Sequence, residues 1–432
     1  MKYYSLHHKA PMVSFREAVI QGIAPDRGLY FPKEIPTLSA EFFQQLLTAD
    51  RNEIAFEVIR GFVGDTLPKS VLKKIISETL VFDFPMVSVE NNISALELYH
   101  GPTLAFKDVG ARFMARCLGY FNQDTSHEKV TVLVATSGDT GGAVADGFYD
   151  VPGVEVVILY PSGKVSDIQE KQLTTLGKNI HAVEVAGSFD DCQEMVKQAF
   201  LDPIITKART LTSANSINVA RWLPQMFYYF FAFQQLPKEA AEVVFSVPSG
   251  NYGNICAGMM AKRLGLPISH FIAATNVNDV VPQYLLSGAY QPQQTKATIA
   301  NAMDVGDPSN FIRIQALYGN NYHRLKEDLS GFAFTDEQTR SALVSLYRAH
   351  SYQADPHGAI GYLALQKYLQ EREAFGVFLE TAHPVKFLDV LPEALSEAIA
   401  IPENIQRILP KKKKAEKIST YSQLNDYLLT NA

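Results

Sequence analysis

The feature of this sequence that most constrains its fold is a repeated pattern of a short apolar run followed by a helix-like stretch. Val130 to Ala135 is almost entirely apolar and rich in β-branched residues, and it leads through a glycine-rich loop into a helical pattern. Runs of the same kind occur at 154–160, 180–185, 243–247, 268–275 and 376–379. Apolar strands that alternate with helices are typical of parallel sheets covered on both faces. The pattern predicts an α/β fold with ligand-binding loops at the carboxyl ends of the strands.

The first ninety residues show a different pattern, which predicts short helices and loops. Ser14 and Glu17 have the spacing of a capping box that opens a helix, and Gly22 can close it. Apolar residues at helical spacing predict further helices at 40–47, 52–62 and 69–79. We therefore expect a helical N-terminal domain over 1–92, a main α/β domain over 93–405 with a smaller subdomain at about 125–225, and a basic C-terminal tail over 406–432.

Composition argues against several classes of function. The chain has 39 Lys and Arg against 45 Asp and Glu, and this net charge of −6 lacks the excess of base that a nucleic-acid surface needs. The four lysines at 411–414 are then read as part of a solvated tail. No apolar run is long enough to span a bilayer, and the N-terminus lacks the apolar region of a signal peptide. Three scattered cysteines indicate a reducing compartment. We expect a cytoplasmic protein without nucleic-acid or membrane partners.

Two glycine-rich loops each follow a predicted strand and precede a predicted helix. The first reads TSGDTGG at 136–142, and the second reads PSGNYGN at 248–254. Small residues there leave backbone N–H groups free to converge on an anion at the positive end of a helix. Neither loop brings the lysine or the acidic ribose partner that nucleotides usually need. The loops suit phosphate or carboxylate, although the first of them taken singly is equally consistent with a tight turn that requires glycine.

Lys107 is a candidate reactive amine. It falls in or just before the first turn of a predicted amphipathic helix, where the macrodipole disfavours a cation, and Phe106 can partly desolvate it. Both effects lower the pKa of an amine, as in lysines that form Schiff bases. The local sequence alone favours a simpler interpretation, in which the side chain extends into solvent beside Asp108.

Two further segments carry candidate ligands. Asn215, Ser216 and Arg221 offer an amide, a hydroxyl and a guanidinium at a helix start, which suits a phosphate dianion if Asn215 lies in the loop before the helix. Thr381 follows the last predicted strand and can hydrogen-bond a heterocycle nitrogen, or equally cap the next helix. No histidine spacing of the HExxH kind is present, so no metal site is expected.

Taken together, these segments resemble the pyridoxal-phosphate enzymes of the tryptophan-synthase-β type, and within them the threonine synthases. The shared segments run in family order along most of the chain: DRGLYFP at 26–32, GPTLAFKD at 101–108, TSGDTG at 136–141, NSIN at 215–218, PSGNYG at 248–253 and TAHP at 381–384. The resemblance implies a fold-type II enzyme with pyridoxal 5'-phosphate as its cofactor. It also implies the conversion of O-phospho-L-homoserine and water into L-threonine and phosphate. We expect a monomer or a homodimer.

The resemblance implies a role for each candidate residue. Lys107 is implied to form the Schiff base with the cofactor and to shuttle protons, and Thr381 to face the pyridine nitrogen. The implied cradle of the cofactor phosphate consists of Gly250, Asn251, Tyr252, Gly253 and Asn254. The substrate carboxylate is implied to bind Ser137, Gly138, Asp139 and Thr140, and the substrate phosphate to bind Asn215, Ser216 and Arg221. Tyr252 departs from the Phe that is frequent in the family at this position.

Two other functions stay compatible with the sequence. One is a serine or threonine dehydratase of the same fold, which needs no second phosphate site, so Asn215, Ser216 and Arg221 weigh against it. The other is a non-catalytic homologue that keeps only the fold. The presence of Lys107 and of both glycine-rich loops weighs against that second alternative.

Overall fold

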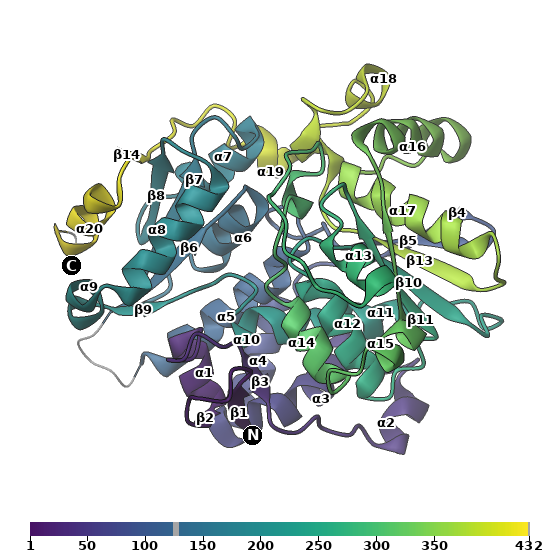
Figure 1. The fold of residues 1–432 in the computed structure, drawn as a ribbon, viewed down its shortest axis with the longest axis horizontal. Coiled ribbons are helices and arrows are strands. Elements are labelled where there is room, and N and C mark those ends of the chain that lie inside the picture. Colours follow the sequence, from purple (N-terminus) through teal and green to yellow (C-terminus); the bar gives the residue numbers. More distant parts are fainter. Residues whose placement is uncertain (124–128, 431–432) are drawn as a thin grey trace.

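Two mainly parallel sheets form the centre of the molecule in the computed structural model, which describes residues 1–123 and 129–430 (Figure 1). The larger sheet has the strand order β12-β11-β10-β13-β5-β4, and only the pair β4–β5 is antiparallel among its described strands. Its strands are β4 (Met86–Glu90), β5 (Ile93–Glu97), β10 (Val243–Pro248), β11 (His270–Thr275), β12 (Leu329–Ala333) and β13 (Phe375–Glu380). The predicted α/β class is confirmed.

The smaller sheet is parallel throughout its described strands, in the order β14-β8-β7-β6-β9. Its strands are β6 (Val130–Ala135), β7 (Val154–Pro161), β8 (Ile180–Val185), β9 (Thr210–Thr212) and β14 (Glu416–Ile418). Its helices are α6 (Asp139–Gly147), α7 (Asp167–Thr174), α8 (Phe189–Leu201), α9 (Pro203–Ala208) and α20 (Tyr421–Thr430). Strands predicted at 130–135, 154–160 and 180–185 all lie in this sheet.

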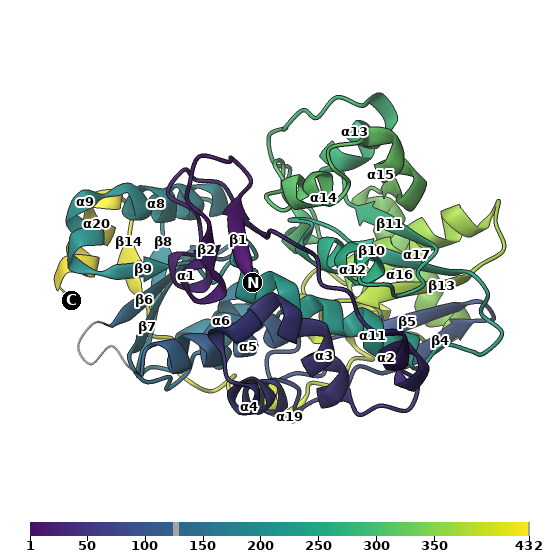
Figure 2. The ribbon, with the colours of Figure 1, turned by 90° about the horizontal axis from the view of Figure 1, so that it is seen from below.

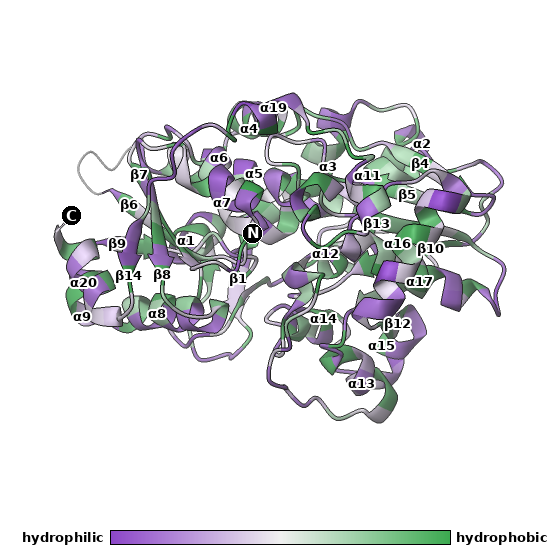
Figure 3. Ribbon diagram, turned by 90° about the horizontal axis from the view of Figure 1, so that it is seen from above, coloured by the Kyte–Doolittle hydropathy of each residue, from purple (hydrophilic) through white to green (hydrophobic). Residues whose placement is uncertain are grey.

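Helices cover both faces of the larger sheet, which explains the continuous apolar runs of its strands. On β10, Val244 points into a core that includes α17 residues, while its neighbour Phe245 points into a core that includes α12 residues. Strand β10 is therefore buried on both faces, and its hydrophobic colouring can be followed in Figure 3. The described α-helices of residues 93–410 that lie outside the smaller sheet are α5 (Lys107–Phe121), α10 (Val219–Trp222), α11 (Phe227–Phe233), α12 (Gly253–Arg263), α13 (Val280–Ser287), α14 (Phe311–Leu317), α15 (Tyr322–Asp328), α16 (Asp336–His350), α17 (Pro356–Leu369), α18 (Glu393–Ser396) and α19 (Glu403–Gln406).

The N-terminal segment contains a small antiparallel sheet in addition to the predicted helices. The strands β1 (Lys2–Ser5), β2 (Val13–Ser14) and β3 (Tyr30–Pro32) pair in the order β2-β1-β3. They have four residues or fewer, which is too short for an alternating pattern to be visible in the sequence. The helices are α1 (Phe15–Gln21), α2 (Ala40–Gln45), α3 (Arg51–Val63) and α4 (Lys69–Thr79). The capping box at Ser14 and the closing Gly22 of α1 are confirmed.

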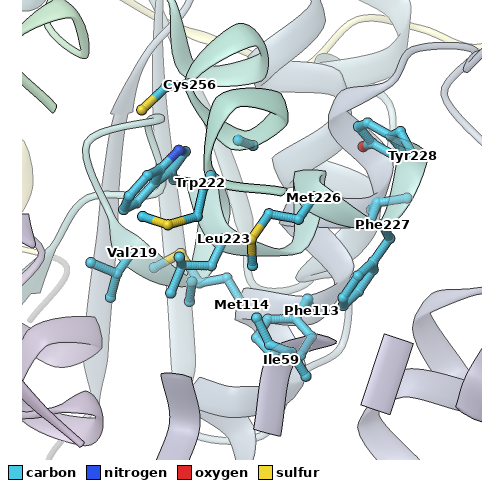
Figure 4. Close-up of a cluster of buried hydrophobic side chains, with 14 of the residues drawn as sticks. Ile59, Phe113, Met114, Val219, Trp222, Leu223, Met226, Phe227, Tyr228 and Cys256 are labelled. Atoms are coloured by element: carbon cyan, nitrogen blue, oxygen red, sulfur yellow. The ribbon is translucent and has the colours of Figure 1, made fainter. Parts of the chain in front are cut away.

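This segment packs against elements of both halves of the molecule. Helix α1 contacts α5 and α10 as well as β9 of the smaller sheet (Figure 2). Residues of α3, α5, α10 and α12 meet in one buried cluster, which includes Trp222, Ile59, Phe113 and Val219 (Figure 4). The N-terminal helices are therefore part of a core that they share with the helices of the larger sheet.

The C-terminal segment 406–432 was predicted to be a solvated tail, and the structure differs. Strand β14 pairs in parallel with β8, and α20 packs against α8 and α9 through the buried Leu424 and Leu428. Lys413, from the lysine run, lies 2.8 Å from Asp167 of α7. Two leucines four residues apart on one helix face account for this docking. In the sequence, this short apolar pattern is difficult to recognise because a run of charged residues lies close to it. None of the described helices has the length and apolarity needed to cross a membrane.

A buried arginine joins the N-terminal sheet to the main body. Arg313 on α14 is fully buried, and its Nη2 donates to the Tyr30 carbonyl of β3 at 3.0 Å. Its Nη1 donates to the Ser216 carbonyl at 3.0 Å and to Asn310 Oδ1 at 2.7 Å. The guanidinium also stacks on Trp222, with its central carbon 4.4 Å from the ring centroid. One planar fork thus fixes three segments that are far apart in sequence.

We predict that Arg313→Met lowers the free energy of unfolding by about 3–5 kcal/mol, because it leaves several buried carbonyls without a donor. Urea unfolding followed by circular dichroism measures this loss. Arg324→Met on the exposed face of α15 is the matched control, and it should stay within about 0.5 kcal/mol of the parent. Equal effects of the two substitutions would contradict the role assigned to Arg313.

Candidate active site

A pocket lies between the two sheets, where loops at the carboxyl ends of β6, β10 and β13 meet the start of α5. The structure brings most of the predicted site residues to its wall: Lys107, Ser137, Thr140, Asn215, Ser216, Arg221, Gly250, Asn251, Tyr252, Gly253, Asn254 and Thr381. Gly138 and Asp139 lie directly behind that wall. Convergence at the carboxyl ends of parallel strands is the geometry that this fold class uses for ligands.

Lys107 is the first residue of α5, and it is held there by the backbone around it. The Phe106 N–H donates to the Thr381 carbonyl at 2.9 Å, which fixes the turn to the end of β13. Only 17% of the Lys107 side chain is exposed, and its Nζ lies 3.9 Å from Asp139 Oδ2. Burial lowers the pKa of Lys107, and the charge of Asp139 opposes this while Lys386 and Arg221 add to it. The geometry favours a partly buried amine that loses its proton readily.

The loop after β10 has the shape of an anion cradle at the start of α12. Tyr252 adopts a left-handed conformation with φ of 60° and is the N-cap residue of α12. A Cβ atom added to Gly250 would lie 2.6 Å from the Ala302 carbonyl oxygen, so only glycine fits against that neighbouring loop. Asn254 Nδ2 is buried without a hydrogen-bond partner among the described residues. An unpaired donor at a helix N-terminus suits the phosphate group of a cofactor.

The loop after β6 is closed by its own threonine. Thr136 Oγ1 accepts from the backbone N–H groups of Gly138 at 2.9 Å and of Gly141 at 2.8 Å. Gly138 has φ of 137°, and an added Cβ would lie 2.4 Å from Gln169. The loop therefore presents Ser137 and Thr140 to the pocket at the start of α6.

Asp139 has a different environment from its neighbours in that loop. Its Oδ1 accepts from Gln169 Nε2 at 3.0 Å and lies 2.6 Å from the Nζ of Lys386. Burial raises the pKa of this carboxyl, but Lys386 and Lys107 more than offset that effect, so the pKa lies well below its usual value. Asp139 is an anion inside the wall, where it balances positive charge.

Lys386 was not identified from the sequence. It lies in the short 3-10 helix Pro384–Phe387, directly after the TAHP segment, and its side chain is completely buried. Its Nζ donates to the Thr103 carbonyl at 2.9 Å in addition to pairing with Asp139. A single lysine in an ordinary loop carries no signal in the sequence, because its partners Thr103 and Asp139 lie more than 240 residues away in the chain.

Arg221 lies on α10 and lines the same pocket. Helix α10 begins at Val219 with Asn218 as its N-cap, so Asn215 lies in the preceding loop as the proposed phosphate site requires. Asn215 Nδ2 donates to the Ala135 carbonyl at 3.1 Å. Arg221 is buried, and its Nε and Nη1 have no partner within the described part of the chain. Burial lowers the pKa of Arg221 to about 10, so it stays a cation at neutral pH. A buried guanidinium with free donors is ready to bind an anion.

A set of supporting side chains that was not identified from the sequence lies behind Thr381. Asp355 accepts from the backbone of Ala382 at 3.0 Å, and its Oδ1 lies 2.8 Å from Nδ1 of His357, which lines the pocket. His357 Nε2 accepts from the backbone of Ala302, so that ring also supports the loop that packs on Gly250. The neighbouring Glu380 is fully buried, and burial together with the charge of Asp355 raises its pKa well above the usual value. These groups hold the walls around Thr381 in place.

No group of three or more His, Cys, Asp or Glu side chains suited to a metal ion occurs in residues 1–123 and 129–430.

Comparisons with known proteins agree with this geometry. Residues 76–377 match the family of pyridoxal-phosphate dependent enzymes, residues 2–80 match the threonine synthase N terminus, and residues 358–427 match the threonine synthase C-terminal family. A threonine synthase of Escherichia coli (strain K12) is 45% identical over 406 residues, which cover 94% of each chain. The chain belongs to the threonine synthase family.

Solved structures of the threonine synthase family share the whole fold. The crystal structure from Escherichia coli superposes with a TM-score of 0.94 at 42% identity and covers 100% of both chains. A threonine synthase from Brucella melitensis with bound pyridoxal phosphate gives a TM-score of 0.90 at 34% identity, and covers 99% of this chain and 98% of that one. A threonine deaminase from Solanum lycopersicum, at 14% identity and a TM-score of 0.56, shares the fold alone. The expected fold type and the dependence on pyridoxal 5'-phosphate are confirmed.

We predict that Gly250→Ala weakens the binding of pyridoxal 5'-phosphate by about 1–3 kcal/mol, since the new methyl group would push the 248–254 loop away from Ala302. Fluorescence titration of the cofactor-free protein measures the change. In the control Gly361→Ala, the added Cβ lies 3.4 Å from Pro248, an ordinary contact, and affinity should be unchanged. Parent-like affinity in Gly250→Ala would show that this loop does not hold the cofactor.

Proposed function

We propose that this member of the threonine synthase family converts O-phospho-L-homoserine and water into L-threonine and phosphate. The observation that carries the proposal is the combination in one pocket of a partly buried lysine with two separate anion sites. One of these sites is the loop at the start of α12, and the other is the unpaired guanidinium of Arg221. A substrate that brings its own phosphate to a phosphate-bearing cofactor requires two such sites.

The cofactor has a place in this pocket that fits its chemistry. The backbone of Gly250 to Asn254 and the free Asn254 Nδ2 would hold its phosphate, and the Thr381 hydroxyl would serve as the partner of its pyridine nitrogen. When bound, the cofactor supplies an electron-accepting ring that stabilises negative charge on substrate carbon atoms. Because Thr381 is neutral, it leaves the ring nitrogen less charged than a carboxylate partner would.

Lys107 has two tasks in this reaction. With the cofactor present, the neutral Nζ would be the group that holds it covalently. Lys107 would also be the group that removes and returns protons at Cα and Cβ of the substrate. The lowered pKa of Lys107 serves both tasks, because a larger fraction of the amine is neutral and can act as nucleophile or base.

The two ends of the substrate are held by different parts of the chain. Its carboxylate binds the 137–140 loop through Ser137, Thr140 and the backbone N–H groups at the start of α6, and Asp139 stays paired inside the wall. Its phosphate binds Arg221 together with Asn215 and Ser216. Arg221 also stabilises the phosphate as it leaves, since a buried cation is most effective where negative charge develops.

The alternative function as a dehydratase is disfavoured by Arg221. A substrate without a phosphate would leave this buried guanidinium without an anion, which is costly for a buried charge.

We also propose that the protein works in the cytoplasm as a monomer or homodimer, on a small-molecule substrate and without nucleic-acid partners. Cys117, Cys192 and Cys256 are buried and unpaired, which suits a reducing compartment.

The purified protein with pyridoxal 5'-phosphate should be yellow and should release phosphate from O-phospho-L-homoserine. Borohydride should bleach the near-visible band and leave the cofactor attached to Lys107, as peptide mass spectrometry would show. Lys107→Ala should bind the cofactor without a covalent bond and lose turnover by several orders of magnitude, because nucleophile and proton carrier disappear together. A protein that stays colourless with added cofactor would refute the proposal.

Arg221→Ala should reduce kcat/KM for O-phospho-L-homoserine by roughly 100- to 1,000-fold, because the phosphate loses its charged partner. Binding of serine, which has no phosphate, should change little. Spectral titrations with both ligands measure the difference. The control is Arg209→Ala, which removes another buried arginine that pairs with Glu155 and should alter stability but not this preference. A similar loss for both ligands in Arg221→Ala would mean that Arg221 only supports the wall.

A further inference from the structure

One carboxylate in the wall of the site lies between two lysines. Asp139 Oδ1 is 2.6 Å from the Nζ of Lys386, and it also accepts from Gln169 Nε2 at 3.0 Å. The other oxygen, Oδ2, is 3.9 Å from the Nζ of Lys107. The two carboxylate oxygens of Asp139 therefore have different partners. Oδ1 contacts Lys386 and Gln169, and Oδ2 points toward the amine of Lys107.

The three charged groups come from different parts of the chain and are shielded from solvent. Lys107 begins α5, Asp139 begins α6, and Lys386 lies in the short helix after β13. The exposed fraction of the side chain is 0% for Lys386 and 4% for Asp139. Lys386 is also tied to the Thr103 carbonyl at 2.9 Å, so its position does not depend on Lys107.

A carboxylate beside a buried reactive lysine can prevent that lysine from losing its proton. If Asp139 were paired with Lys107 alone, loss of the Lys107 proton would leave a buried carboxylate without a counter-charge, and that state is strongly disfavoured. The pairing would then hold the proton on Lys107. With Lys386 in place, Asp139 keeps a partner whether Lys107 is charged or neutral.

We propose that Lys386 is a positioning residue that keeps Asp139 paired and oriented while Lys107 loses and regains its proton. The inference rests on the function proposed above for Lys107. Lys386 is not among the described residues that line the pocket, and it acts through Asp139.

The charges around Lys107 support this role. The groups that face it are Asp139, Lys386, Arg221 and Asp355. Burial is the main reason that the pKa of Lys107 is lowered, and Lys386 and Arg221 lower it further, while Asp139 and Asp355 oppose them. Removal of Lys386 eliminates one of the two cations and leaves Asp139 free to bind the Lys107 proton more tightly.

The test follows the proton on the Lys107 nitrogen in the holoenzyme. The near-visible absorption of the bound cofactor is recorded against pH in the parent, in Lys386→Met and in Asp139→Asn. We expect the midpoint to move to higher pH by about 1–2 units in Lys386→Met, and to lower pH in Asp139→Asn, because the first change frees the carboxylate and the second removes it. The double variant should lie between the two single variants.

A second measurement uses the full chain before cofactor is added. The rate of reductive methylation of Lys107 by formaldehyde and cyanoborohydride, read by mass spectrometry, depends on the neutral amine. At neutral pH it should fall about tenfold for each unit by which Lys386→Met raises the pKa. The control Lys262→Met breaks another lysine–aspartate pair, with Asp328 at 2.6 Å, and should change neither readout.

The possible outcomes separate this inference from the function on which it rests. Failure of borohydride to label Lys107 in the parent would overturn the proposed function. Normal labelling with unmoved midpoints in both single variants would overturn only the role of Lys386. If Lys386→Met does not fold, the downward shift in Asp139→Asn still decides, since that variant keeps both lysines, and an unmoved or raised midpoint there overturns the inference.

Discussion

The site depends on the parallel pairing of β5 with β13. Their register places Glu97 beside Glu380, and the chains continue side by side beyond the sheet, where Phe106 donates to the Thr381 carbonyl and Ala105 bridges Ala382. These segments lie about 280 residues apart in the sequence. Without that backbone pairing, the start of α5 would have no fixed relation to the end of β13, and Lys107 and Thr381 would not line the same pocket.

Charge is the second constraint on this pocket. Lys107, Lys386 and Arg221 lie close enough to influence one another, and Asp139 is the closest anion to the two lysines within the described structure. The excess of positive charge suits ligands with several negative charges and few apolar atoms. Because the groups are buried, salt in the solution screens them less than it would screen charges on the surface. Discrimination in favour of a dianionic ligand should therefore persist at high ionic strength.

The features that could be predicted from the sequence are those set by interactions between residues that are close together in the chain. Strands such as Val130–Ala135 and the capping boxes of α1 and α7 depend on neighbouring residues, and their patterns identified them. The strands β1, β3 and β14 are too short to show a period, and their pairing partners are distant. The glycine-rich loops were recognisable because each candidate anion site consists of consecutive residues. Lys386 and His357 were missed since their importance lies only in which atoms they meet after folding.

Strand β14 also has a consequence for the synthesis of the protein. It is the edge partner of β8, yet more than 220 residues separate the two in the chain. During translation, β6, β7 and β8 emerge long before residue 416, so the outer edge of β8 lacks this partner until residues 416–418 have left the ribosome. An open edge strand is a template for pairing with other chains. The nascent protein thus passes through a long interval in which its smaller sheet is exposed to aggregation, and the pairing of β14 with β8 ends that interval.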